Sequence, residues 1–192
     1  MKKIFLLLLI IFTMTGCGSE EKVVEEKVAP DDKIVVAYFS CTGNTQMLAE
    51  TAAKVLNADM YEIKPKSPYT EEDLNYSNET TRATVEQRNS SARPELSDTN
   101  ANFSEYNVIV LAFPIWWHIE PRIIDTFIET YNFEDKTIIP ICTSGGSEIG
   151  TISENLKMLA NYHANWLEGR TFLKNISEKE LSKYFEDVGL IK

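Results

Sequence analysis

The chain has 192 residues, enough for one domain of ordinary size whose hydrophobic core stabilises it unaided. Its formal net charge is −10, and the sequence contains no cluster of basic residues. Because binding to a phosphate backbone requires a positive face, this composition argues against a nucleic-acid partner. An anionic ligand would have to be held by backbone N–H groups and hydroxyls rather than by Lys or Arg.

The first 17 residues have the pattern of an export signal. Lys2 and Lys3 precede an apolar run over 4–14, which is too short to span a bilayer but has the length of a signal-peptide core. "TMTGC" then places small residues before Cys17. This resembles a bacterial lipoprotein signal, in which Cys17 is lipidated; the alternative is a plain secretion signal with an incidental Cys. The resemblance implies a location at the cell membrane, lipid-anchored on the extracytoplasmic face.

A charged stretch separates this signal from the globular part. Residues 18–32, "GSEEKVVEEKVAPDD", are poor in aromatic residues and show no sustained period, which predicts a disordered acidic tether. A single domain is expected over 33–192. A tether of this length would keep that domain close to the membrane surface.

From Lys33 onward, strand and helix patterns alternate. Continuous β-branched and apolar runs predict strands that are buried on both faces, and helical spacing of apolar residues follows them. Pro121 is expected as the first residue of the second helix, and Ser177 with Glu180 forms a capping box before the last, which Gly189 ends. The predicted strands are 33–39, 60–63, 108–113, 137–142 and 166–172, and the predicted helices are 45–56, 121–131, 152–161 and one after Ser177.

Such alternation predicts an α/β fold, a parallel sheet with helices on both faces. Two features resist this assignment. Pro140 lies inside a predicted central strand, where it removes a ladder hydrogen bond. The segment 64–107 is too long for a simple connection, so we expect it to contain an irregular helix within 71–89 and to form part of a ligand rim.

Three loops follow predicted strands and therefore meet at the carboxyl edge of the sheet, where open α/β sheets bind ligands. They are "SCTGNT" (40–45), "PIWWHIEP" (114–121) and "TSGGSEIG" (143–150). The first offers hydroxyls and Gly43 ahead of a helix N-terminus, a composition that favours an anion. Cys41 and Cys142 end strands that are not neighbours, so both are expected to be free thiols.

The first loop can be compared with three phosphate-binding loops. It lacks the Lys of a Walker loop. Cys41 to Asn44 fit the opening of a low-molecular-weight tyrosine phosphatase loop, but Met47 stands where that family needs Arg. The third comparison is with the loop that binds the FMN phosphate in flavodoxins, which has the pattern Ser/Thr-x-Thr-Gly-x-Thr. Residues 40–45 match this pattern at every fixed position.

With "PIWW" and "TSGG" in the other two loops, the chain resembles a flavodoxin over about 33–190. This resemblance implies a flavodoxin-like, doubly wound, five-stranded parallel sheet of order 2-1-3-4-5 and an FMN cofactor. The phosphate would lie in the first loop, the flavin ring would lie between the other two, and Trp116 and Trp117 would form an aromatic wall unless they are core residues. The cofactor-binding residues implied are Ser40, Cys41, Thr42, Gly43, Asn44, Thr45, Pro114, Ile115, Trp116, Trp117, His118, Ser144, Gly145, Gly146 and Ser147.

The resemblance implies electron transfer by bound FMN, with redox partner proteins or small electron acceptors near the membrane and at a low potential because the chain is acidic. His118 stands where similar proteins often carry a small residue. It would act either as a proton donor to the flavin or as a bulky residue at the rim of the site. An NAD(P)H-dependent flavin reductase of quinones or similar acceptors is the alternative, and a binding protein that has lost its cofactor is a third possibility.

Overall fold

The computed structural model describes residues 32–160 and 163–191. Their strands form one parallel sheet in the order β2-β1-β3-β4-β5, and β6 also pairs with β4. The strands are β1 (Ile34–Tyr38), β2 (Asp59–Glu62), β3 (Val108–Pro114), β4 (Thr137–Thr143), β5 (Asn165–Trp166) and β6 (Arg170–Phe172). The helices are α1 (Asn44–Leu56), α2 (Arg82–Arg88), α3 (Arg122–Thr130), α4 (Ile152–Leu159) and α5 (Glu178–Asp187), with a short 3₁₀ turn, η1 (Glu72–Leu74). The predicted α/β architecture and strand order are confirmed. The predicted signal, Cys17 and almost all of the tether lie outside the described residues.

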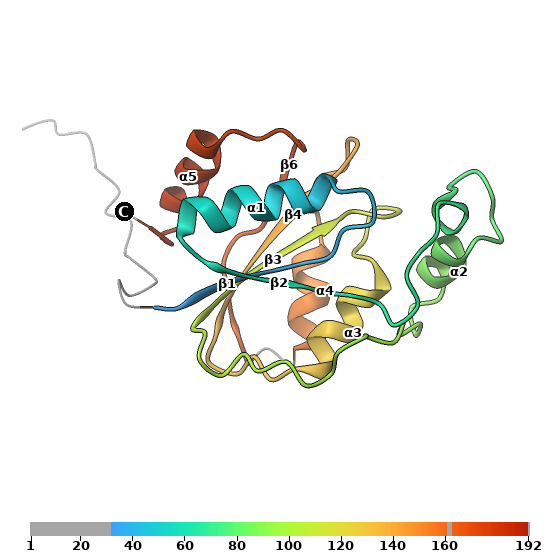
Figure 1. Ribbon diagram of the computed structural model, residues 1–192, viewed down its shortest axis with the longest axis horizontal. Coiled ribbons are helices and arrows are strands. Elements are labelled where there is room, and N and C mark those ends of the chain that lie inside the picture. Colours follow the sequence, from blue (N-terminus) through green and yellow to red (C-terminus); the bar gives the residue numbers. More distant parts are fainter. Residues whose placement is uncertain (1–31, 161–162, 192) are drawn as a thin grey trace, which may run out of the picture.

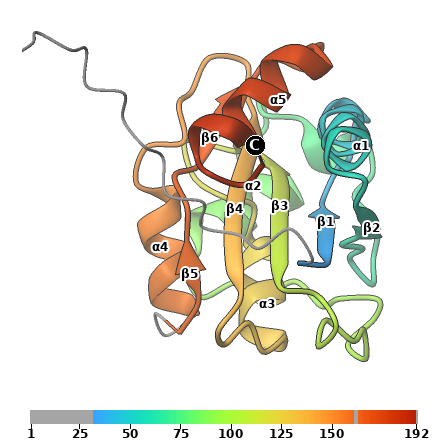
Figure 2. The same ribbon diagram turned by 90° about the vertical axis from the view of Figure 1, so that its left-hand side faces the viewer.

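The helices cover the sheet in two layers, α1 and α5 on one face and α3 and α4 on the other (Figures 1 and 2). Each layer has its own core, because successive side chains of a strand point to opposite faces. Val36, Val110 and Ile139 pack toward α1 and α5, whereas Ile109 and Leu111 pack toward α3 and α4. This two-sided burial is why β1, β3 and β4 read as continuous apolar runs.

The ends of the helices show which local signals were informative. The Ser177–Glu180 capping box is present at α5, and Gly189, at φ 75°, follows the end of this helix as predicted. Pro121 is not the first helical residue, because its ψ of 138° is extended and α3 begins at Arg122. None of the described helices is both long enough and apolar enough to cross a membrane.

The long segment 64–107 contains two short helical pieces, η1 and α2, rather than one irregular helix. Its α2 stands at one end of the molecule, drawn in green in Figure 1, on the side where the loops after β1 and β3 emerge. The segment therefore reaches the carboxyl edge of the sheet, as expected of a ligand rim.

Pro140 explains why the predicted strand 166–172 is two short strands. The carbonyl of Ile138 accepts a hydrogen bond from the N–H of Leu167 at 3.0 Å, so the backbone polar groups of Ile138 face the outer strand formed by β5 and β6. Backbone groups two residues apart in a strand point the same way, so those of Pro140 face this outer strand too. Pro140 has no N–H to donate there. The outer strand is interrupted between Trp166 and Arg170, and the Tyr184 hydroxyl donates to the Glu168 carbonyl at 2.6 Å in the interruption.

Gly169 makes this interruption possible, and replacing it tests the arrangement. A Cβ at this position would lie 2.9 Å from the Pro140 carbonyl oxygen and 2.5 Å from the Ile149 Cδ1. We expect Gly169→Ala to lower the free energy of unfolding by about 1–3 kcal/mol, measured by urea denaturation of the flavin-free chain.

Gly145→Ala is the matched control, because nothing lies within 4 Å of a Cβ built there. Its free energy of unfolding should stay within about 0.5 kcal/mol of the wild type. Equal stability of the two variants would show that the chain at Gly169 has room to move away from Pro140.

Candidate functional site

The three predicted loops meet at the carboxyl edge of the sheet and line one open cleft of about 1380 Å³. Ten of the predicted binding residues line it: Ser40, Cys41, Thr42, Asn44, Thr45, Pro114, Ile115, Trp116, Ser144 and Gly145. Five do not: Gly43, Trp117, His118, Gly146 and Ser147. The structure thus brings residues from all three loops together.

The first loop presents free backbone donors to the cleft. Gly43, at φ 82°, turns the chain into α1, and no side chain caps this helix. The N–H groups of its first turn have no partner within the helix, since the first helical bond runs from Met47 N to Gly43 O at 3.0 Å. These N–H groups and the helix dipole suit an anion at the cleft floor.

A buried hydrogen bond ties the first loop to the third. The hydroxyls of Thr45 and Thr143 lie 2.7 Å apart, and both residues are buried. Thr143 is the last residue of β4, so this bond fixes the start of α1 against the end of a central strand. The two loops therefore hold a constant spacing across the cleft.

The surroundings of Cys41 disfavour its nucleophilic thiolate form. Burial raises the pKa of its thiol to about 12, and the positive charge of Arg82 offsets this only in part. A phosphatase cysteine needs a lowered pKa, so the burial of this thiol argues against a phosphatase loop. Cys41 and Cys142 are both free, as the sequence predicted.

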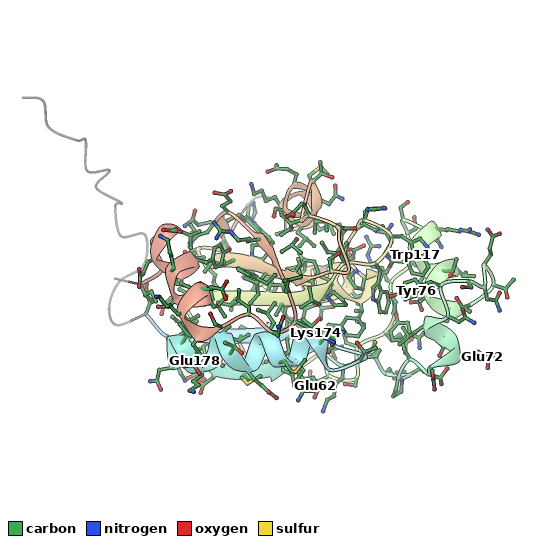
Figure 3. All side chains as sticks on the ribbon, turned by 90° about the horizontal axis from the view of Figure 1, so that it is seen from above. Glu62, Glu72, Tyr76, Trp117, Lys174 and Glu178 are labelled. Atoms are coloured by element: carbon green, nitrogen blue, oxygen red, sulfur yellow. The ribbon has the colours of Figure 1, made fainter. Side chains whose placement is uncertain are left out.

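The two tryptophans take different roles. Trp116 lines the cleft but is only 4% exposed, because it packs edge-on against Phe39 and Tyr69, with ring centroids 5.5 and 5.3 Å away. Trp117 is half-buried against the same core and packs on Tyr76, with ring centroids 4.5 Å apart (Figure 3). Trp116 and Tyr76 line the cleft and Trp117 does not, so a place for Trp117 in an aromatic wall beside the ring stays a prediction.

His118 and Ser147 join the second loop to the third. The His118 Nδ1 and the Ser147 Oγ lie 3.0 Å apart, and the Ser144 Oγ accepts hydrogen bonds from the N–H groups of Gly146 and Ser147. His118 thus has a partner at the cleft rim that the sequence did not indicate.

Two sets of cleft residues were missed by the sequence reasoning. The first set comes from the long segment, whose length had indicated a rim without naming residues: Thr70, Glu71, Glu72, Leu74, Asn75 and Tyr76. The second follows β6: Leu173, Lys174 and Asn175. Lys174, labelled in Figure 3, adds an exposed cationic residue to the lining of the cleft, which the sequence did not indicate.

A buried ionic cluster lies behind the second loop. Glu120 and Asp125 are each about 1% exposed, and Arg122 lies 3.0 Å from Asp125 and 3.9 Å from Glu120. Burial raises the pKa of Glu120 to about 7 and, in the same direction, that of Asp125. One carboxyl of this pair therefore carries a proton near neutral pH.

Comparison with known proteins assigns this sequence to a family. The sequence model described as flavodoxin matches residues 33–188. The chain belongs to the flavodoxin family. No protein with a curated description matches it.

Two solved structures described as candidate flavoproteins are 38% identical to this chain in sequence. A candidate flavoprotein from Bacteroides uniformis superposes with a TM-score of 0.76, over 81% of this chain and 98% of that one. A second, from Bacteroides eggerthii, gives a TM-score of 0.78, over 84% of this chain and 100% of that one. A flavoprotein from Lactobacillus acidophilus in complex with FMN is 18% identical, with a TM-score of 0.57 over 80% and 98% of the two chains. This last likeness shows the shared fold.

Proposed function

We propose that this flavodoxin-family chain binds FMN and transfers electrons through it. The observation that carries the proposal is the first loop, which delivers hydroxyls and the uncapped N-terminus of α1 into a cleft walled by the other two loops. Support also comes from the Lactobacillus acidophilus relative in fold, which was crystallised with FMN.

The residues present fit this cofactor. FMN, when bound, supplies a ring that accepts and releases electrons. Ser40, Thr42 and Thr45 with the first-turn N–H groups of α1 would hold its phosphate. Trp116 and Tyr76 would lie beside the ring, and the backbone near 114–118 and 144–147 would meet its polar edge.

The charges around the cleft set the direction of the redox potential. Glu71 and Glu72 line the cleft, while Lys174 is the one cation among the described residues that line it. Negative charge disfavours adding electrons to a nearby group, although exposed charges are screened by salt. These carboxylates support a low potential, with Lys174 acting in the opposite direction.

The membrane attachment proposed for this carrier rests on the sequence before the described domain. Lipidation at Cys17 would anchor the chain on the extracytoplasmic face, and the acidic tether would keep the domain near that surface. Its partners would then be redox proteins or small acceptors at the membrane.

Stepwise reduction tests the proposed function. We expect the FMN-loaded chain, reduced without oxygen, to pass through two spectrally separate one-electron steps, because a carrier between one-electron partners has to resolve them. Visible absorption spectra recorded at each addition of reductant measure this. A colourless preparation that does not take up FMN would refute the redox function.

The volume of the cleft supports a second candidate function, that of a flavin reductase. Its volume of about 1380 Å³ exceeds the range of roughly 300–1000 Å³ that a single small ligand usually fills. Space for a nicotinamide or a quinone beside the ring is thus available. Steady NADH oxidation with an added quinone, together with reduction in a single two-electron step, would favour the reductase over the carrier.

A further inference from the structure

The turn over 116–119 has an unusual backbone. Two hydrogen bonds between Trp116 and Ile119 close it, at 2.9 and 3.0 Å, and its central residues Trp117 and His118 have φ values of 47° and 66°. Turns with two positive φ values normally contain Asn and Gly, because a bulky side chain is strained there. The turn therefore needs support from outside its own sequence.

Gln87 of α2 supplies contacts on both sides of this turn. Its Nε2 donates to the carbonyl of Trp116 at 3.2 Å and to the carbonyl of Glu120 at 3.0 Å. Its Oε1 accepts from the N–H of Arg122 at 3.2 Å, and its own carbonyl accepts from the Arg122 guanidinium at 3.2 Å. The entry to the turn, its exit and the start of α3 are thus held by one residue.

The chemistry of this position is specific to a carboxamide. A Gln head group carries two N–H donors and an acceptor in one plane, and here all three functions are used. The residue is only 6% exposed, so water cannot readily replace its bonds. Gln87 does not line the cleft, whereas Trp116, which it holds, does.

We propose that Gln87 is a positioning residue of the flavin site, which fixes the 116–119 turn against the flavin ring from the neighbouring segment 64–107. The proposal rests on the proposed binding of FMN. It assigns to the long segment a role beyond forming a rim, since α2 holds the second loop in a strained conformation.

Gln87→Glu tests this role with little change in shape. The carboxylate keeps the acceptor for Arg122 N but loses both donors and faces the carbonyl oxygens of Trp116 and Glu120. We expect affinity for FMN and for riboflavin to fall alike, by about tenfold, because the affected loop would meet the ring that both share. The Ile119 amide should exchange hydrogen faster in the flavin-free variant, and the absorption bands of bound flavin should shift.

Two further variants make the test decisive. Gln87→Leu removes all side-chain hydrogen bonds without adding charge and should weaken binding in the same way. Val85→Ala, at a 54% exposed position on the same helix, should change neither affinity nor exchange. Unchanged affinity in a flavin-binding Gln87→Glu chain would refute the role of Gln87, and a wild-type chain that bound neither flavin would refute the proposed function itself.

Discussion

Thr42→Asp should lower the affinity of the chain for FMN by about a hundredfold or more, while affinity for riboflavin stays within about threefold of the wild type. Thr42 is exposed and lines the cleft in the loop proposed to hold the phosphate. A carboxylate there would repel the phosphate dianion at close range, and riboflavin carries no phosphate. Quenching of flavin fluorescence during titration with the flavin-free chain measures both constants.

The neutral variant Thr42→Asn separates charge from shape. It should bind FMN far better than Thr42→Asp, since the Asn side chain is similar in size to that of Asp and carries no charge. Folding should not suffer in either variant, because Thr42 is exposed; in Thr42→Asp, the negative charge just before α1 also interacts favourably with the helix dipole. Equal losses for FMN and riboflavin would place the phosphate elsewhere or show a general disturbance of the cleft.

The parts of the fold that follow from local patterns were predictable from the sequence. Strands β1, β3 and β4 are almost entirely apolar because helices cover both faces, and this pattern identified them. The α5 capping box and Gly189 were also predicted correctly, because each of these signals depends on residues only a few positions apart. The positions of the three loops follow from strand direction alone.

The features that depend on distant contacts were not predictable. Pro140 was recognised as unfavourable, but its consequence, the split of the outer strand, falls on a neighbouring strand that is distant in sequence. The sequence placed Trp116 and Trp117 together in one loop but did not show that Trp117 and His118 are the two positive-φ residues of a tight turn. Neither Trp117 nor His118 is a residue type that signals such a turn.

The burial of individual polar residues was also not predictable from the sequence. Gln87 lies in a polar stretch that reads as an exposed helix face, yet it is buried against the second loop. Glu120 looks like an ordinary loop carboxylate, because acidic residues are rarely buried. Tertiary packing determines the burial of both residues, and local sequence patterns do not indicate it.

Replacing Glu120 by Gln should remove a loss of stability that the wild type suffers as pH rises. The pKa of Glu120 is about 7 in the folded chain, raised by burial from an ordinary value of 4.5. Between these values the unfolded chain releases its proton while the folded chain keeps it, so rising pH favours unfolding. We expect the wild type to lose about 2–3 kcal/mol between about pH 5 and about pH 8, and Glu120→Gln to lose correspondingly less.

A proton shared between Glu120 and Asp125 would pair two buried oxygens that otherwise have no partner. Glu120 Oε2 and Asp125 Oδ1 are buried without a hydrogen-bond partner, and a proton on Glu120 would satisfy both by joining them. With that proton, the cluster is neutral, because Arg93 and Arg122 balance Asp125 and Glu129. In the Glu120→Gln variant, the side-chain amide would donate in place of the proton at every pH.

Glu129→Gln is the matched control for this test. Glu129 pairs with Arg93, at 2.6 Å, but its side chain is 39% exposed, whereas that of Glu120 is 2% exposed. Urea denaturation of the flavin-free variants across the pH range should therefore show the wild-type slope in Glu129→Gln and a flatter one in Glu120→Gln. Titrations elsewhere in the chain are common to all three proteins and cancel in the comparison. Parallel profiles for the wild type and Glu120→Gln would show that the buried pair is ionised throughout and that Arg122 and Arg93 alone compensate its charge.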